Sequence, residues 1–351
     1  MKLKFMEGTT GKWIKRIVVI LLIVGLLAFG AYKMFFNKNN NVEHNVQETL
    51  NNLDGYYMEA SMEFYKGEDS RKYDVKVSYK KDSNNLFRVS MYDKASEQEQ
   101  IILKNNDGVY ILVPSVNKNF KIQSNWPTNS SYPYLLQSLA KDIANETNPI
   151  ITEEDESYTI ETNTSLHNDA IAVKQKIIFD KETTKPKEVL VYDSNGNLYI
   201  RVLFTKIELN NSIEENEFSV EKSMETSRLE YKEEKVVYDR DISYPVIYPE
   251  GASLIGEDTV TSDNGEEVRT IMKYTGDVGF TIIQEYINEK EVTVFQQEVG
   301  EITTVLGNVA IIKENGVQMF YQGVEYTVGS NDLAVMQMLE ILAGYMVNTS
   351  K

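Results

Sequence analysis

The side chains that most enzymes use for chemistry are scarce in this 351-residue chain. It has no cysteine and only two histidines, His44 and His167. The lack of cysteine excludes disulfides, thiolate nucleophiles, thiolate metal sites and attachment through a lipid-modified cysteine. Neither histidine belongs to an HExxH pair, and no GxSxG, Walker or GxGxxG sequence is present. The sequence therefore predicts a protein that is not an enzyme and that needs no metal and no cofactor.

Carboxylates are the remaining groups that could catalyse a reaction. Acidic runs occur at 153–156, 214–215 and 266–267, and a pair of carboxylates can hydrolyse a glycosidic bond. In a chain with 53 acidic and 36 basic residues, such runs are most often solvated loops. A secreted hydrolase is therefore the least favoured of the functions open to this chain.

An apolar segment near the N-terminus predicts attachment to a membrane. Residues 17–32 carry no charge, and the segment up to residue 36 gives ~30 Å of helix, the thickness of a bilayer core. Five basic residues precede it, which places residues 1–16 in the cytoplasm. The alternative is a signal peptide cleaved near residues 28–30. The expected location is the cell membrane, with a single pass at 17–36 and an extracytoplasmic C-terminus.

Charge narrows the range of partners. The whole chain has a net charge of −17, although its first 40 residues carry seven basic side chains and one acidic one. The rest of the chain is therefore strongly acidic and repels phosphate backbones and anionic lipid headgroups. We expect no nucleic-acid partner.

Beyond the anchor, the sequence has the two-residue periodicity of half-buried antiparallel strands. Apolar residues alternate with polar ones at 57–64 and 73–79. Further strands are expected at 86–92, 99–104, 109–114, 157–162, 173–179, 188–192 and 198–207. Helical spacing occurs instead at 42–54 and at 133–144. The second helix is a candidate lid over the sheet.

A charge-dense run divides the predicted ectodomain in two. Residues 221–241 contain little apolar sequence and are predicted to be a linker between a domain at 37–220 and a smaller one at 242–351. The second domain has strand-like segments and ends in a helix capped by Ser330. The expected fold class is mainly β (α+β). It comprises an N-terminal signal-anchor helix, an open antiparallel half-barrel with a helical lid, and a small C-terminal α+β domain.

Four motifs in the first domain resemble a known family. They are Asn84-Asn85-Leu86-Phe87-Arg88, the segment 106–111, the segment 179–187, and the segment 207–210 followed by Phe218. Together they are similar to the LolA/RseB-like lipoprotein-carrier superfamily, and most similar to its Gram-positive sporulation and germination branch of the GerS type. Residues 242–351 resemble an uncharacterised C-terminal domain of Gram-positive membrane regulatory proteins, through the segment 279–284 and the final helix.

The resemblance implies a half-barrel whose apolar cavity takes acyl chains or partner peptides. The lid would comprise Leu135, Leu139 and Ile143, with Arg88 bonded to lid-helix carbonyls as in the carriers. For the apolar residues that face inward on the half-barrel, ordinary core packing is the commoner case, and Arg88 could equally be a solvated arginine on the strand face. The side chains expected to line the cavity are Met62, Phe64, Val75, Val77, Phe87, Val89, Ile111, Ile177, Val191 and Val202.

Two non-enzymatic functions follow from these observations. In the first, the half-barrel docks an envelope or sporulation and germination protein at the extracytoplasmic surface. In the second, the cavity carries or senses lipid acyl chains or lipoproteins. An enclosed apolar pocket would favour the second function, and reproducible capture of one envelope protein would favour the first.

Overall fold

The computed structural model describes residues 21, 24, 44, 46–50, 52–67, 69–123, 126, 132, 134–164, 166, 171–230, 241–261, 268–286 and 294–347. Apart from Leu21 and Val24, which are helical, the predicted tail at 1–16 and anchor at 17–36 lie outside these residues. Within the described ranges, no helix is both long and apolar enough to cross a membrane. Residues 46–50, in the first predicted helix, are helical, and Val46 and Leu50 are buried.

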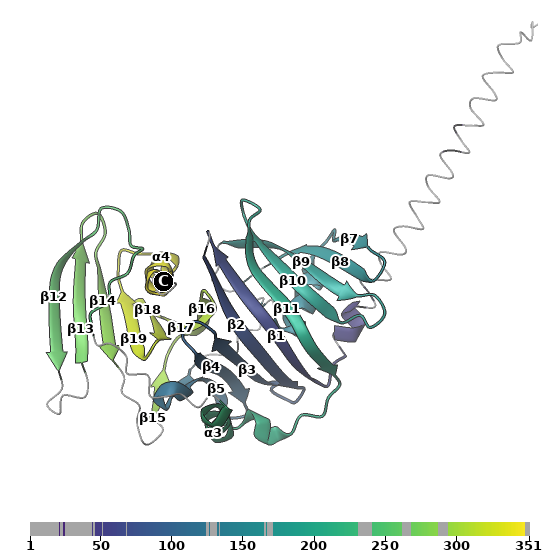
Figure 1. Cartoon of the computed structure of the whole chain (residues 1–351), viewed down its shortest axis with the longest axis horizontal. Coiled ribbons are helices and arrows are strands. Elements are labelled where there is room, and N and C mark those ends of the chain that lie inside the picture. The colour runs from purple at the N-terminus through teal and green to yellow at the C-terminus, as the bar shows by residue number, and fades with distance from the viewer. Residues whose placement is uncertain are drawn as a thin grey trace, which may run out of the picture.

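Twelve strands form one large open sheet (Figure 1). Their order across the sheet is β15-β6-β5-β4-β3-β2-β1-β11-β10-β9-β8-β7. All neighbours pair antiparallel except β15 and β6, which pair parallel. The strands are β1 (Gly55–Lys66), β2 (Asp69–Lys80), β3 (Leu86–Asp93), β4 (Gln98–Asn105), β5 (Gly108–Val113), β6 (Lys118–Ile122), β7 (Ile150–Glu153), β8 (Ser157–Asn163), β9 (Ala172–Asp180), β10 (Pro186–Asp193), β11 (Leu198–Leu209) and β15 (Val294–Glu298).

The two faces of this sheet differ because side chains alternate along each strand. The inner face carries most of the apolar residues: Met58 of β1 lies opposite Val77 of β2, and Met62 lies opposite Val202 of β11. The outer face carries the intervening residues. The β1–β11 pairing joins the two halves of the sheet, so the inner face is continuous across it.

Seven strands form a second sheet, in the order β12-β13-β14-β19-β18-β17-β16. The helix α4 (Val335–Met346) packs on β16, β18 and β19. The strands are β12 (Ser253–Thr261), β13 (Val268–Thr275), β14 (Phe280–Tyr286), β16 (Glu301–Val305), β17 (Asn308–Lys313), β18 (Gly316–Tyr321) and β19 (Val324–Gly329). The expected fold class, mainly β with an open antiparallel sheet and a small C-terminal sheet unit, is confirmed.

Short helical elements cover both faces of the large sheet. On the inner side lies α2 (Leu136–Asn145), close to its predicted position. On the outer side lies α3 (Val220–Glu230), preceded by the one-turn helix η2 (Glu215–Phe218). The one-turn helix η1 (Pro114–Val116) joins β5 to β6, and its Val116 packs in the inner-face cluster. The helix α3 occupies the first half of the segment predicted to be a linker. Its Met224 packs with Leu103 and Leu112 of the sheet, so this half of the segment is part of the fold.

The two predicted domains share part of one hydrophobic core, and the second sheet has a further cluster of its own with α4. The cluster on the inner face includes Ile302, Val309, Ile311 and Phe320 of the second sheet. Strand β15, which precedes β16 in the chain, extends the large sheet beside β6. The C-terminal segment is therefore built into the first domain rather than attached only through a linker.

Candidate binding site on the inner face

The residues predicted to line a cavity all lie on the inner face of the large sheet. Each is at most 6% exposed, and all belong to one hydrophobic cluster. Strand alternation brings them together, because each occupies an inward position on its own strand. The ten are Met62, Phe64, Val75, Val77, Phe87, Val89, Ile111, Ile177, Val191 and Val202.

The predicted lid covers one half of the inner face. Leu135, Leu139 and Ile143 of the α2 region are buried in the same cluster. Two polar contacts fix the helix on the sheet: Tyr56 Oη donates to Gln137 Oε1 at 2.8 Å, and Gln175 Nε2 donates to Asp142 Oδ2 at 2.6 Å. Because these bonds are largely buried, they hold α2 in one position over the sheet.

Arg88 does not join the lid. It alternates with Phe87 and Val89 on β3 and therefore points to the outer face. There Arg88 Nε donates to Ser223 Oγ of α3 at 3.2 Å and lies 4.0 Å from Glu217 Oε1. The expected bond to the lid helix is thus replaced by a contact that holds α3 on the outer face.

The other half of the inner face is covered by a hairpin of the second sheet. Strands β16 and β17 are joined by Leu306 and Gly307, with φ of 48° and 88°, which is typical of a two-residue hairpin turn. A Cβ added at Gly307 would lie 2.5 Å from Tyr73 Cε2 and 2.7 Å from Phe64 Cε2. The hairpin tip therefore lies in direct contact with the aromatic side chains of β1 and β2.

Buried polar contacts hold the second sheet, which contains this hairpin, against the large sheet. Gln100 of β4 donates to Phe320 O at 2.9 Å and accepts from Val309 N–H at 2.7 Å. Arg71 of β2 pairs with Asp93 and donates to Met346 O at 3.1 Å, at the C-terminal end of α4. Sequence patterns could not reveal these contacts, because Gln100 and Arg71 sit in strands where polar residues usually face solvent.

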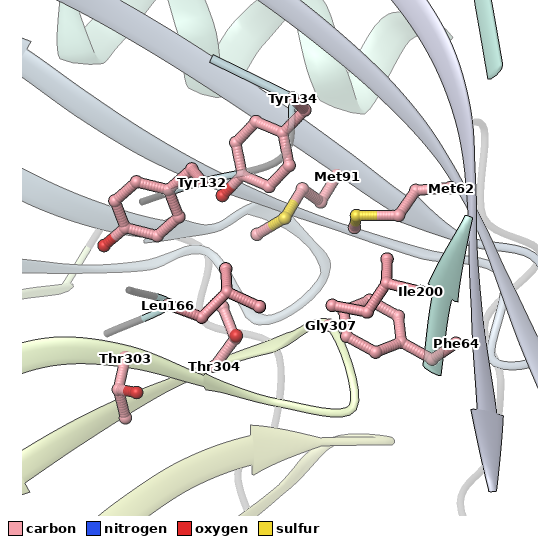
Figure 2. A pocket seen from close by; sticks show the side chains of 10 residues that line it. All are labelled: Met62, Phe64, Met91, Tyr132, Tyr134, Leu166, Ile200, Thr303, Thr304 and Gly307. Carbon is pink, nitrogen blue, oxygen red and sulfur yellow. The ribbon is translucent and has the colours of Figure 1, made fainter. Parts of the chain in front are cut away.

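Figure 2 shows a pocket between the hairpin and the sheet. Its volume is about 20 Å³, which is room for roughly one water molecule. Met62, Met91 and Ile200 approach it from the sheet, and Thr303, Thr304 and Gly307 approach it from the hairpin. This pocket is far too small for an acyl chain in the conformation described.

Tyr132 and Tyr134 complete the lining of this pocket. Burial raises the pKa of both phenols above the usual tyrosine value, so they are neutral hydrogen-bond donors. The remaining lining groups are apolar or are threonine hydroxyls. These side chains suit the packing of apolar groups rather than proton transfer.

His44 takes no part in this site. His44 is exposed and lies 3.9 Å from Glu48, one helical turn away, and His167 lies outside the described residues. In the described part of the chain, no group of three or more His, Asp or Glu side chains could hold a metal ion.

The fold and the inner face define a class of protein: a mainly β protein with one large open antiparallel sheet, covered by a helix and by its own C-terminal sheet. Two solved structures are similar to it at low sequence identity. A chain of the Pseudomonas aeruginosa MucA/MucB complex is 12% identical, with a TM-score of 0.32, covering 85% of this chain and 96% of that one. A LolA superfamily protein from Nitrosomonas europaea is 13% identical, with a TM-score of 0.30, covering 52% and 98%.

The chain belongs to the family of YdcC-like sporulation proteins, whose family model matches residues 14–218. It is also similar to the sporulation protein YdcC of Bacillus subtilis strain 168, with 29% identity over 334 residues. That alignment covers 95% of this chain and 98% of the relative. The similarity therefore includes the C-terminal sheet as well as the residues that the family model matches.

Proposed function

We propose that this chain is a non-enzymatic sporulation protein that is anchored in the cell membrane by residues 17–36 and binds a protein partner outside the cytoplasm. The observation that favours a protein partner over a lipid is the occupied inner face. Its apolar residues are covered by α2 and by the β16–β17 hairpin, and the pocket beside the hairpin tip holds only about 20 Å³. Partner contact is therefore expected on surfaces that the chain itself leaves uncovered.

Co-purification tests partner binding. A tagged full-length chain is isolated from the membranes of sporulating cells, and an unrelated tagged single-pass protein serves as the control. We expect one envelope protein to be enriched reproducibly with this chain and not with the control. If repeated isolations enrich nothing, the proposal of a protein partner is wrong.

Acyl-chain carriage is the competing function, and direct binding tests it. A soluble chain comprising residues 41–351 is titrated with a fluorescent fatty acid. Because the pocket has room for only about one water molecule, we expect no saturable binding. Saturable binding at one site per chain would instead favour the lipid carrier, and would require the hairpin or α2 to move.

The proposed orientation can be tested with single cysteines, because the chain contains none of its own. Asn195 lies exposed in the β10–β11 turn, and Thr10 lies in the proposed cytoplasmic tail. A membrane-impermeant maleimide should label Asn195→Cys in cells whose outer layers have been removed, and should label Thr10→Cys only after permeabilisation. The reverse pattern would overturn the proposed topology.

A further inference from the structure

We propose that a groove on the outer face of the large sheet binds a basic, amphipathic segment of a partner protein. This inference rests on the proposed function and names the surface and the chemistry of the contact. The groove lies beside α3 and includes positions on β5, β6 and β15. Its volume is about 850 Å³, which is within the usual range of ligand sites.

The two predicted domains form this outer groove jointly. Phe295 of β15 lies beside Asn119 of β6 in the parallel pairing, and both line the groove. On the opposite side, α3 contributes Leu229. The C-terminal segment thus supplies one wall of the groove through β15, which gives this segment a role beyond covering the inner face.

Apolar side chains in the outer groove are left uncovered. Phe295 is 54% exposed and Leu229 is 66% exposed, although Met224, one turn before Leu229, is buried against the sheet. Large exposed apolar side chains that line the same groove are typical of a protein contact surface.

A buried polar atom in the groove lacks a partner. Asn119 is 4% exposed, and its Oδ1 has no hydrogen-bond partner within the described residues. Leaving a buried acceptor unpaired costs about 1–3 kcal/mol. A rotation of the Asn119 side chain toward the groove lets a lysine or arginine of a bound segment donate to this oxygen, which removes the cost.

The charge of the groove determines the sign of the charge that its partner should carry. Three acidic residues line it, Asp107, Glu221 and Glu225. Among its lining residues, Arg228 is the one lysine or arginine. A basic segment is therefore attracted, and its apolar face can cover Leu229 and Phe295. A second copy of this chain is a poor occupant, because each copy has a net charge of −17.

The groove is held rigidly, which favours binding with little rearrangement. Arg88 bonds to Ser223 in the middle of α3, Lys76 pairs with Glu230 at its end, and Asn105 Nδ2 donates to Phe218 O just before it, at 3.1 Å. These contacts fix α3 relative to β2, β3 and β4. A preorganised groove loses less conformational entropy when a partner binds.

A peptide titration tests the chemistry of the groove. The probe is a fluorescein-labelled helical peptide of leucine, alanine and lysine with its leucines on one face, added to the full chain in a neutral detergent. A matched peptide has glutamate in place of lysine. We expect the basic peptide to bind, and the Leu229→Ser and Glu225→Lys variants each to weaken it about tenfold. The Asn119→Ala variant should weaken it about fivefold, the equivalent of one hydrogen bond of about 1 kcal/mol.

Matched substitutions elsewhere provide the control. Ile255 is 65% exposed on β12 of the second sheet, and Glu182 is exposed in the β9–β10 turn. Ile255→Ser and Glu182→Lys should leave peptide affinity unchanged, and thermal melts should show that all variants are folded. The proposal would be overturned if the basic and acidic peptides bound equally well, or if groove and control variants lost peptide affinity to the same extent.

Cross-linking separates this inference from the proposed function. A photoreactive benzoylphenylalanine at position 295 should cross-link the protein recovered by co-purification, whereas the same group at position 255 should not. If that protein is recovered but cross-links only from position 255, the groove is not the binding site, and the proposal of a protein partner stands. If no protein is recovered, partner binding fails and the peptide titration still decides whether the groove takes basic segments.

Discussion

At the scale of single residues, Gly307 decides whether the hairpin can cover the inner face. Its φ of 88° favours glycine, and a Cβ there would collide with Tyr73 and Phe64. Gly196 has a similar φ of 82° but nothing within 4 Å of the Cβ position, so it is a matched control. We expect Gly196→Ala to lower the free energy of unfolding by about 1–2 kcal/mol through backbone strain alone.

The same substitution at the hairpin tip should cost more. Gly307→Ala adds overpacking against two buried aromatic rings, which costs about 1–3 kcal/mol beyond the backbone strain. Urea denaturation of both variants measures the difference. Equal losses at the two positions would show that the hairpin tip does not press on the sheet as described.

Arg71 is the second residue whose contacts bridge the two sheets. It is buried with Asp93 and also donates to Tyr321 Oη at 2.8 Å. Arg71→Met leaves the Asp93 carboxylate buried without its cation, so we expect the free energy of unfolding to fall by about 3–5 kcal/mol. Arg201→Met, in the partly exposed pair with Glu188, should cost at most about 1 kcal/mol. Similar losses of unfolding free energy in the two variants would contradict a buried ion pair between Arg71 and Asp93.

At the scale of elements, the parallel pairing of β15 with β6 is the most specific feature of the large sheet. Val294 N–H donates to Asn117 O at 3.0 Å. Val294→Pro removes this donor, so we expect faster hydrogen exchange at the amides of β6 that pair with β15. Phe295→Pro is the control, because alternation turns its N–H toward the free edge of the sheet. If both variants exchange alike, β15 does not pair in this register.

At the scale of the whole molecule, the shared core predicts how the chain unfolds. Ile302, Val309, Ile311 and Phe320 belong to the core of the large sheet although they come from the second one. We therefore expect a single cooperative transition in calorimetry of residues 41–351, with equal calorimetric and van't Hoff enthalpies. Two separate transitions would restore the picture of independent domains joined by a linker.

Local patterns predicted most of the large sheet. Two-residue alternation located β1 to β5 and β8 to β11, and it identified ten inward residues that are all buried. It missed β6, β7, β12 and β16, which are short or carry few alternating apolar residues. It also assigned the segment of α3 to a linker, because only Ser223, Met224 and Ser227 of that helix are buried and the charged residues dominate its sequence.

The candidate site was predicted only in part. Alternation fixes which side chains share a face, so the composition of the inner face followed from the sequence. It also fixes the direction of Arg88, opposite to Phe87 and Val89, and this signal outweighs the family expectation of a lid contact. The α2 lid over the face was predicted, but the hairpin that covers the rest could not be, since it comes from a segment far away in the chain.

The sequence by itself determined that this protein is rich in strands, acidic, free of cysteine and poor in catalytic side chains, because these properties depend on composition and on spacing between near neighbours. The tertiary structure alone decided that β15 extends the large sheet, that the β16–β17 hairpin covers the inner face, and that an open groove lies beside α3. The physical reason is that strand pairing and core packing join residues far apart in sequence, and their energies depend on shape and burial, which short-range periodicity does not record.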